Sequence, residues 1–163
     1  MHNKFYYIWE QQPLNMKDRT IDYILRTTWL AVQKMYNEEA LKFDSTMATG
    51  FTLLSIDPEK GTPSTALGPK MGMEATSLSR ILKAMEKKGL IDRHPNPEDG
   101  RGVIIKLTPF GVQKRTYSKD RVLTFNEKIK NNISDEKLKH FNEVADVILE
   151  MVSNKKIYTP NDN

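Results

Sequence analysis

The sequence predicts a mainly α fold with a small β-wing, a winged helix-turn-helix flanked by long N- and C-terminal helices. Residues 62–111 read in order as two short helices, a β-hairpin with a charged, glycine-containing tip, and the start of another helix. Longer stretches whose apolar residues recur every three or four positions lie on either side, at 14–46 and 118–157. We therefore expect a single domain over 1–163, with 47–115 as its winged helix-turn-helix lobe.

The first long helical pattern begins after Pro13 and continues to about Phe43. Its apolar positions are Ile21, Leu25, Trp29, Val32, Tyr36, Ala40 and Phe43. This spacing places them on one face of a helix. A second helix is expected over 47–56, and Asp57-Pro58 ends it.

The helix-turn-helix itself is expected to begin at the Thr-Pro-Ser run of residues 62–64. Pro is preorganised at the first helical position, and the preceding Thr can cap the helix. Gly72 supplies the turn before the next helix, which covers 74–88, and Gly89 ends that helix as its C-cap.

The helix over 74–88 has two different faces. One face is apolar and consists of Leu78, Ile81, Leu82 and Met85. The opposite face is polar and mostly cationic and consists of Thr76, Arg80, Lys83 and Lys87. A short cationic helix on a compact scaffold has the shape and charge that a DNA major groove accepts, so this helix is the expected recognition helix.

Two strands and two long helices complete the pattern. The strands are expected at 90–95 and 103–108, joined by the turn-rich polar stretch 95–102. The last two helices are expected to begin at the capping pairs Thr108-Pro109 and Ser134-Asp135.

Positive charge is concentrated around the predicted recognition helix. Between Lys70 and Arg115 there are ten Lys or Arg against five Asp or Glu, a net charge of +5, whereas the whole chain carries +4. The rest of the chain is therefore close to neutral. Such a concentration favours a polyanionic partner, although a solvated lysine-rich helix face explains the charge equally well.

Several functional classes are disfavoured by composition. The chain has no cysteine, which excludes disulfides, thiol redox sensing and Cys-ligated zinc. Its three histidines, His2, His94 and His140, are too scattered to predict a metal site, and no cofactor is expected. We find no phosphate-binding glycine loop, nucleophile with a nearby base, or carboxylate pair, so an enzyme is not expected. The apolar run 5–9 is too short for a signal peptide or membrane span, and we expect a cytoplasmic protein.

The two flanking helical regions hold more apolar surface than the small central lobe can cover. A partner subunit provides the natural cover, and we expect a two-fold homodimer with N- and C-terminal dimerisation helices that interlock. The alternative is an all-α bundle that packs only on itself.

Residues 71–111 closely resemble the MarR (multiple-antibiotic-resistance regulator) family of bacterial transcription factors. The matching motifs are Met71-Gly72-Met73, Thr76-Ser77-Leu78-Ser79-Arg80, Met85-Glu86-Lys87-Lys88-Gly89-Leu90, Arg93, Asp99-Gly100-Arg101 and Leu107-Thr108-Pro109-Phe110-Gly111. The resemblance implies a transcriptional regulator, typically a repressor, that binds a pseudo-palindromic operator as a homodimer, with one recognition helix per half-site and wing tips in the flanking minor grooves.

The resemblance also implies roles for individual residues. Side chains expected to face bases and phosphates are Ala75, Thr76, Ser77, Ser79 and Arg80, beside the cationic Lys83 and Lys87. Arg101 would be the wing-tip arginine, oriented by Asp99. A ligand pocket between the dimer arm and the DNA-binding lobe is implied as well, for a small aromatic or acyl-type acidic effector. Its candidate lining residues are Trp29, Tyr36, Phe51 and Tyr117, each of which could instead be a core aromatic.

The main alternative function is a winged-helix protein-interaction or dimerisation module without specific DNA binding. The operator, the regulated genes and the effector are not specified by the sequence.

Overall fold

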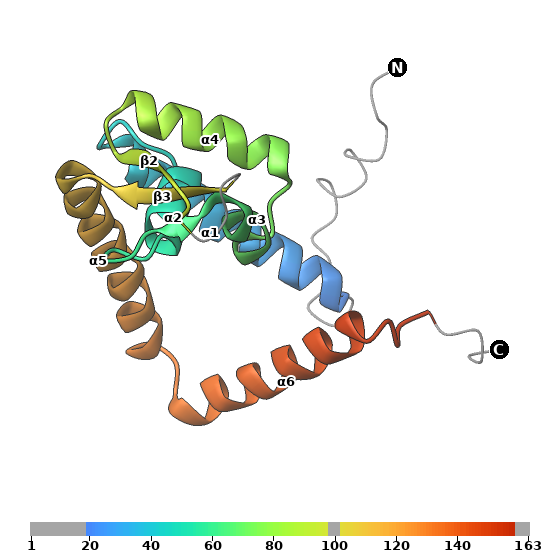
Figure 1. The fold of residues 1–163 in the computed structure, drawn as a ribbon. Helices are drawn as coiled ribbons and strands as arrows, with labels where there is room; N and C mark the ends of the chain where they lie inside the picture. Colours follow the sequence, from blue (N-terminus) through green and yellow to red (C-terminus); the bar gives the residue numbers. More distant parts are fainter. Residues whose placement is uncertain (1–18, 98–101, 159–163) are drawn as a thin grey trace, which may run out of the picture.

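The computed structural model describes residues 19–97 and 102–158, and Figure 1 shows their arrangement. The elements follow the order α1 (Ile21–Leu41), α2 (Met47–Ser55), β1 (Thr62–Pro63), α3 (Ser64–Met71), α4 (Ala75–Lys87), β2 (Ile91–Pro95), β3 (Val103–Leu107), α5 (Pro109–Lys130) and α6 (Asp135–Ser153). The predicted winged helix-turn-helix is therefore confirmed, with a long helix before it and two after it.

The strands form an antiparallel sheet in the order β1-β3-β2. Strands β2 and β3 are the two predicted wing strands, and Arg93 lies opposite Ile105 in their register. The short strand β1 adds to the other edge of β3, where Thr62 lies opposite Ile105. Ile105 thus occupies the middle of the sheet and is fully buried.

The expected capping role of Thr62 is wrong. Thr62 belongs to β1, and Pro63 occupies the N-cap position of α3, so the helix starts at Ser64. The Thr62 hydroxyl instead accepts a hydrogen bond of 2.9 Å from the backbone N–H of Asp57. The Thr-Pro-Ser run does mark the helix start, but its threonine closes the preceding loop.

The predicted C-cap Gly89 is wrong by one residue, because Lys88 is the C-cap of α4 and Gly89 follows it with φ of 68°. Three other predicted helix boundaries are confirmed. Thr108 caps α5 by accepting from the Gly111 N–H, and Ser134 caps α6 by accepting from the Lys137 N–H. Gly72 follows α3 with φ of 61°, a left-handed conformation that glycine adopts without steric cost. This turn sets the direction in which α4 leaves α3.

The core lies inside the winged lobe. It consists of Leu53, Ile56, Leu67, Leu78, Leu82, Met85, Leu90, Ile91 and Ile105. Helix α4 contributes three of these side chains from its predicted apolar face, and Ile81 packs partly buried beside them. Burial of this stripe fixes which side of α4 faces solvent.

The long helices lie largely outside this core. Helix α5 leads away from the wing, and α6 turns and runs along the opposite edge of the molecule from α4 (Figure 1). Neither α1 nor α6 has a buried residue in the single chain. Among the described residues, no helix is both long and apolar enough to cross a membrane.

Candidate functional site

Helix α4 lies along one edge of the molecule (Figure 1). Every α4 residue predicted to contact DNA is exposed, namely Ala75, Thr76, Ser77, Ser79, Arg80, Lys83 and Lys87. Ala75 and Ser79 line a shallow groove between α3 and α4. Arg80, Lys83 and Lys87 line a second depression farther along the helix.

Three cations of α4, Arg80, Lys83 and Lys87, have no ion-pair partner among the described residues. Glu86 on the same helix is paired with Arg93 of β2, whose Nε lies 2.9 Å from Oε2. In the described ranges, no carboxylate lies within ion-pair distance of Arg80, Lys83 or Lys87. Their charge therefore remains available to an external polyanion.

Two predicted wing residues, Asp99 and Arg101, lie outside the described residues.

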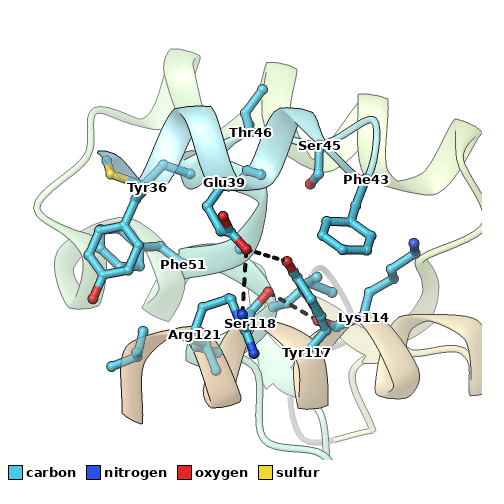
Figure 2. A pocket seen from close by; sticks show the side chains of 16 residues that line it. Tyr36, Glu39, Phe43, Ser45, Thr46, Phe51, Lys114, Tyr117, Ser118 and Arg121 are labelled. Atoms are coloured by element: carbon cyan, nitrogen blue, oxygen red, sulfur yellow. Dashed lines mark hydrogen bonds and ion pairs between the residues drawn. The ribbon is translucent and has the colours of Figure 1, made fainter. Parts of the chain in front are cut away.

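A pocket lies between the C-terminal half of α1, α2 and the middle of α5 (Figure 2). Its lining residues are Tyr36, Glu39, Ala40, Phe43, Ser45, Thr46, Met47, Gly50, Phe51, Leu53, Leu54, Lys114, Tyr117, Ser118, Arg121 and Val122. The cavity volume is about 50 Å³. This is about a third of the ~150 Å³ of an apolar cavity that accommodates benzene, so a ring could enter only if side chains moved.

Glu39 is the polar centre of the pocket. Its Oε1 accepts a hydrogen bond of 2.9 Å from the Tyr117 hydroxyl and lies 3.5 Å from a guanidinium nitrogen of Arg121 (Figure 2). Its Oε2 accepts from the ammonium of Lys42. The hydrogen bonds from Lys42 and then from Tyr117 lower the pKa of Glu39.

The pKa of the Tyr117 phenol shifts in the opposite direction. Desolvation and, secondly, its hydrogen bond to the Glu39 carboxylate raise the pKa of Tyr117. Both shifts favour a neutral phenol that donates to a charged carboxylate. The pair therefore joins α5 to α1 in one protonation state over the neutral pH range.

Aromatic rings form the rest of the wall. Phe43 and Tyr117 have centroids 4.0 Å apart, and Tyr36 meets Phe51 edge-on at 6.2 Å. Lys114 lies over the Phe43 ring at 5.8 Å and over Phe110 at 5.2 Å. The Arg121 Nε is buried and has no hydrogen-bond partner in the described part of the chain. The pocket thus combines ring surfaces with two cations and one carboxylate.

The described residues contain no comparable cluster for a metal ion. Within residues 19–97 and 102–158, no three His, Asp or Glu side chains are grouped so that they could hold a metal ion.

Part of the chain is similar to a known protein family. The family model described as MarR family matches residues 46–103, which include α2, the helix-turn-helix and the start of β3. Over these residues the chain is similar to the MarR family. Its sequence is 30% identical over 90 residues to the HTH-type transcriptional regulator SarZ of Staphylococcus haemolyticus, covering 55% of this chain and 61% of that protein. It is 33% identical over 79 residues to the multiple antibiotic resistance protein MarR of Escherichia coli, covering 48% of this chain and 55% of that protein. The matched segment thus spans less than two thirds of the length of either relative.

Solved structures show that the fold extends beyond the matched sequence. The MepR–DNA complex of S. aureus superposes with a TM-score of 0.74 at 20% identity, covering 81% of this chain and 98% of that chain. A mutant of E. coli MarR in complex with operator DNA superposes with a TM-score of 0.71 at 22% identity, covering 79% and 93%. The flanking helices of this chain are therefore part of the fold that it shares with these structures.

Three of the four predicted pocket residues line the pocket. Tyr36, Phe51 and Tyr117 come together there. Trp29 is not among the lining residues and is stacked on Phe51 instead, with centroids 6.5 Å apart and 47% of the Trp29 residue exposed. Any contact between Trp29 and a ligand stays a prediction.

The sequence reasoning missed the charged residues of the pocket, Glu39, Lys114 and Arg121. A helical-spacing test could have found them. Glu39 follows Tyr36 by three positions, and Lys114 and Arg121 lie three positions before and four after Tyr117. Residues at these separations share a helix face. Scanning only for aromatic side chains left them out.

Proposed function

We propose that this chain is a sequence-specific DNA-binding transcriptional regulator. The observation that carries this proposal is the exposed face of α4, where Arg80, Lys83 and Lys87 have no internal carboxylate partners among the described residues. A helix of this kind enters the major groove, where Arg reads guanine edges and Lys contacts phosphates. Support also comes from related structures that were solved with DNA, MepR and the E. coli MarR mutant.

The proposed DNA contacts follow the geometry of α4. Ala75, Thr76, Ser77, Ser79 and Arg80 contact bases and nearby phosphates, and Lys83 and Lys87 contact the backbone. Lobe 47–115 is the DNA-binding part of a single domain, and 14–46 and 118–157 form its dimerisation helices. Since the chromosome of a bacterium lies in the cytoplasm, the regulator acts there.

The proposed assembly is a homodimer. Helix α6 exposes large apolar side chains that a monomer would leave in water, including Phe141, Val144, Val147, Leu149 and Val152, which are 56–64% exposed. Helix α1 exposes Ile21, Ile24, Leu25 and Leu30 in the same way. Burial of these faces between two copies stabilises the dimer and presents two α4 helices to a pseudo-palindromic operator.

The regulator is proposed to be a repressor that responds to a small effector in the pocket. The effector is an aromatic or acyl-type acid, since the rings of Tyr36 and Phe51 offer apolar contact and Lys114 and Arg121 offer positive charge. If the effector lowers the affinity for DNA by a given factor, DNA lowers the affinity for the effector by the same factor, because coupling between two sites is reciprocal.

A salt titration with random duplex DNA tests the DNA-binding function. We expect the logarithm of the binding constant to fall steeply with the logarithm of salt concentration, because phosphate contacts release counterions. Sequencing the genomic fragments that the protein retains would then give the operator. Absence of binding at low salt would support the second candidate, a winged-helix module for protein interaction or dimerisation, which the exposed apolar helices also suit. The relative SarZ is an HTH-type transcriptional regulator, and we propose no enzymatic activity for this chain.

A further inference from the structure

The turn that ends α1 lies between the pocket and the recognition helix. On one side, Glu39 and Phe43 contact Tyr117 and line the pocket (Figure 2). On the other side, Asp44 contacts Lys88, the C-cap residue of α4. A single short stretch of chain thus touches both sites.

The Lys88 side chain at the end of α4 contacts the turn mainly through the backbone of Asp44. The Lys88 ammonium donates to the Asp44 carbonyl oxygen at 2.7 Å and lies 3.0 Å from its Oδ2. The Asp44 side chain is 96% exposed, so its charge is screened by water. The hydrogen bond to the carbonyl oxygen is therefore the main contact, and it ties the Lys88 side chain to the position of the Asp44 backbone.

The turn is stiff. Backbone hydrogen bonds join Phe43 N–H to the Ala40 carbonyl, Asp44 N–H to the Leu41 carbonyl, and Ser45 N–H to the Ala40 carbonyl. Asp44 has φ of 50°, a left-handed conformation that Asp adopts more readily than most non-glycine residues. A displacement of Phe43 would act on Asp44 through these hydrogen bonds.

The pocket is too small for a ring unless its wall moves. At about 50 Å³ it lies well below the ~150 Å³ of a benzene-sized cavity. Phe43 is 41% exposed, so it can swing toward solvent, whereas Leu53 on another wall is buried in the core. An aromatic occupant therefore displaces Phe43 most readily.

We propose that residues 39–45 couple occupancy of the pocket to the recognition helix, with the Asp44–Lys88 contact as the link to α4. An occupant moves Phe43, and the hydrogen-bonded turn moves Asp44 with it. The end of α4 then shifts or loses its contact with Asp44. The inference rests on the proposed function for its biological meaning, because a shift of α4 changes regulation only if α4 binds DNA.

A built-in occupant tests the coupling without an identified effector. Val122 lines the pocket, and Val122→Trp places a ring there; Val122→Phe is the smaller alternative if the tryptophan variant does not fold. We expect Val122→Trp to weaken binding to a retained operator fragment about tenfold, within the usual range for coupled sites. In the Lys88→Gln background, the same change should weaken binding by less than about threefold, because the link to α4 is removed.

Lys70→Gln is the matched control background. Lys70 also donates to a backbone carbonyl, that of Ser55, at 2.7 Å, but this bond joins α3 to α2 and does not involve the turn. The full effect of Val122→Trp, about tenfold, should persist in Lys70→Gln. An equal effect in the Lys88→Gln and wild-type backgrounds, or no effect of Val122→Trp on wild type, would overturn the coupling.

A DNA-free measurement separates this inference from the proposed function. In ¹H–¹⁵N spectra, Val122→Trp should shift the amide resonances of the last turn of α4, residues 84–88, and the shifts should shrink in Lys88→Gln. If wild type binds no DNA but these shifts occur, the proposed function fails and the coupling stands. If DNA binds but the shifts are the same in both backgrounds, the coupling fails alone.

Discussion

Tyr117 on α5 donates its hydroxyl hydrogen to the carboxylate of Glu39 on α1 at 2.9 Å, across a sequence separation of 78 residues. The same carboxylate oxygen lies 3.5 Å from Arg121, one helical turn farther along α5. Helix α5 begins directly after the wing strand β3, and α1 precedes the winged lobe, so this contact joins the two helices at the pocket.

The stability of the protein should depend on pH through Glu39. Its pKa is lowered in the folded state, so its contribution is present above the unfolded value of about 4.3 and is lost as pH falls through the lower folded value. We expect Glu39→Gln to lower the free energy of unfolding at neutral pH and to reduce the decline of that free energy as pH falls below the unfolded pKa of about 4.3. Denaturant unfolding at several pH values measures both.

Glu38→Gln is the control for this experiment. It removes the neighbouring carboxylate, which is 63% exposed and 3.9 Å from Lys34, and should change the free energy of unfolding little. Parallel pH profiles for wild type and Glu39→Gln would show that the Glu39 contacts do not stabilise the fold.

Gly111→Ala should destabilise the protein, although glycine to alanine usually favours a helix. A Cβ at Gly111 would lie 1.9 Å from the Leu90 carbonyl oxygen, where α5 packs on the residue before β2. We expect a loss of about 1–3 kcal/mol or more in unfolding free energy, measured in denaturant. Gly50→Ala is the comparison, because its Cβ would meet the Ser118 hydroxyl at 3.3 Å and that side chain can rotate. A more stable Gly111→Ala variant would contradict the close approach.

Arg80 and Lys83 should differ in what they read. If Arg80 meets a guanine edge, Arg80→Ala costs roughly 1–3 kcal/mol per half-site and flattens the preference at one base position. Lys83→Ala should weaken binding to all DNA sequences alike. It should also reduce the slope of log binding constant against log salt concentration by about one per phosphate contact. Binding to a panel of single-base operator variants distinguishes them. Unchanged selectivity in Arg80→Ala would reassign this residue to the backbone.

The folded unit should be a dimer under all conditions in which it is stable. Val147 on α6 is 56% exposed in the single chain, and Val147→Asp should disrupt the interface because it places a charge among apolar side chains. Light scattering over a wide dilution range measures the mass. A well-folded wild-type species of 18.8 kDa at micromolar concentration would refute the dimer.

Local patterns in the sequence correctly predicted most elements of the winged lobe. The burial of Leu78, Leu82 and Met85, with Arg80 and Lys83 exposed, follows from helical periodicity alone. The starts of α5 and α6 follow from short capping motifs, in which a side chain reaches a backbone N–H within the first helical turn. These features were predictable because the interactions that produce them are local.

Contacts between distant segments were decided only by the tertiary structure. Thr62 reads locally as a helix cap, yet its pairing opposite Ile105 makes it a strand residue. Trp29 and Tyr36 share an apolar helical spacing, yet only Tyr36 reaches the pocket. Glu39 becomes the pocket's polar centre because α5 brings Tyr117 and Arg121 to it. The sequence by itself determined which side of each helix is apolar and which is polar. Tertiary packing determined which of these sides contact each other. Strand pairing and helix packing join residues far apart in the chain, and no regular spacing in the sequence indicates such pairs.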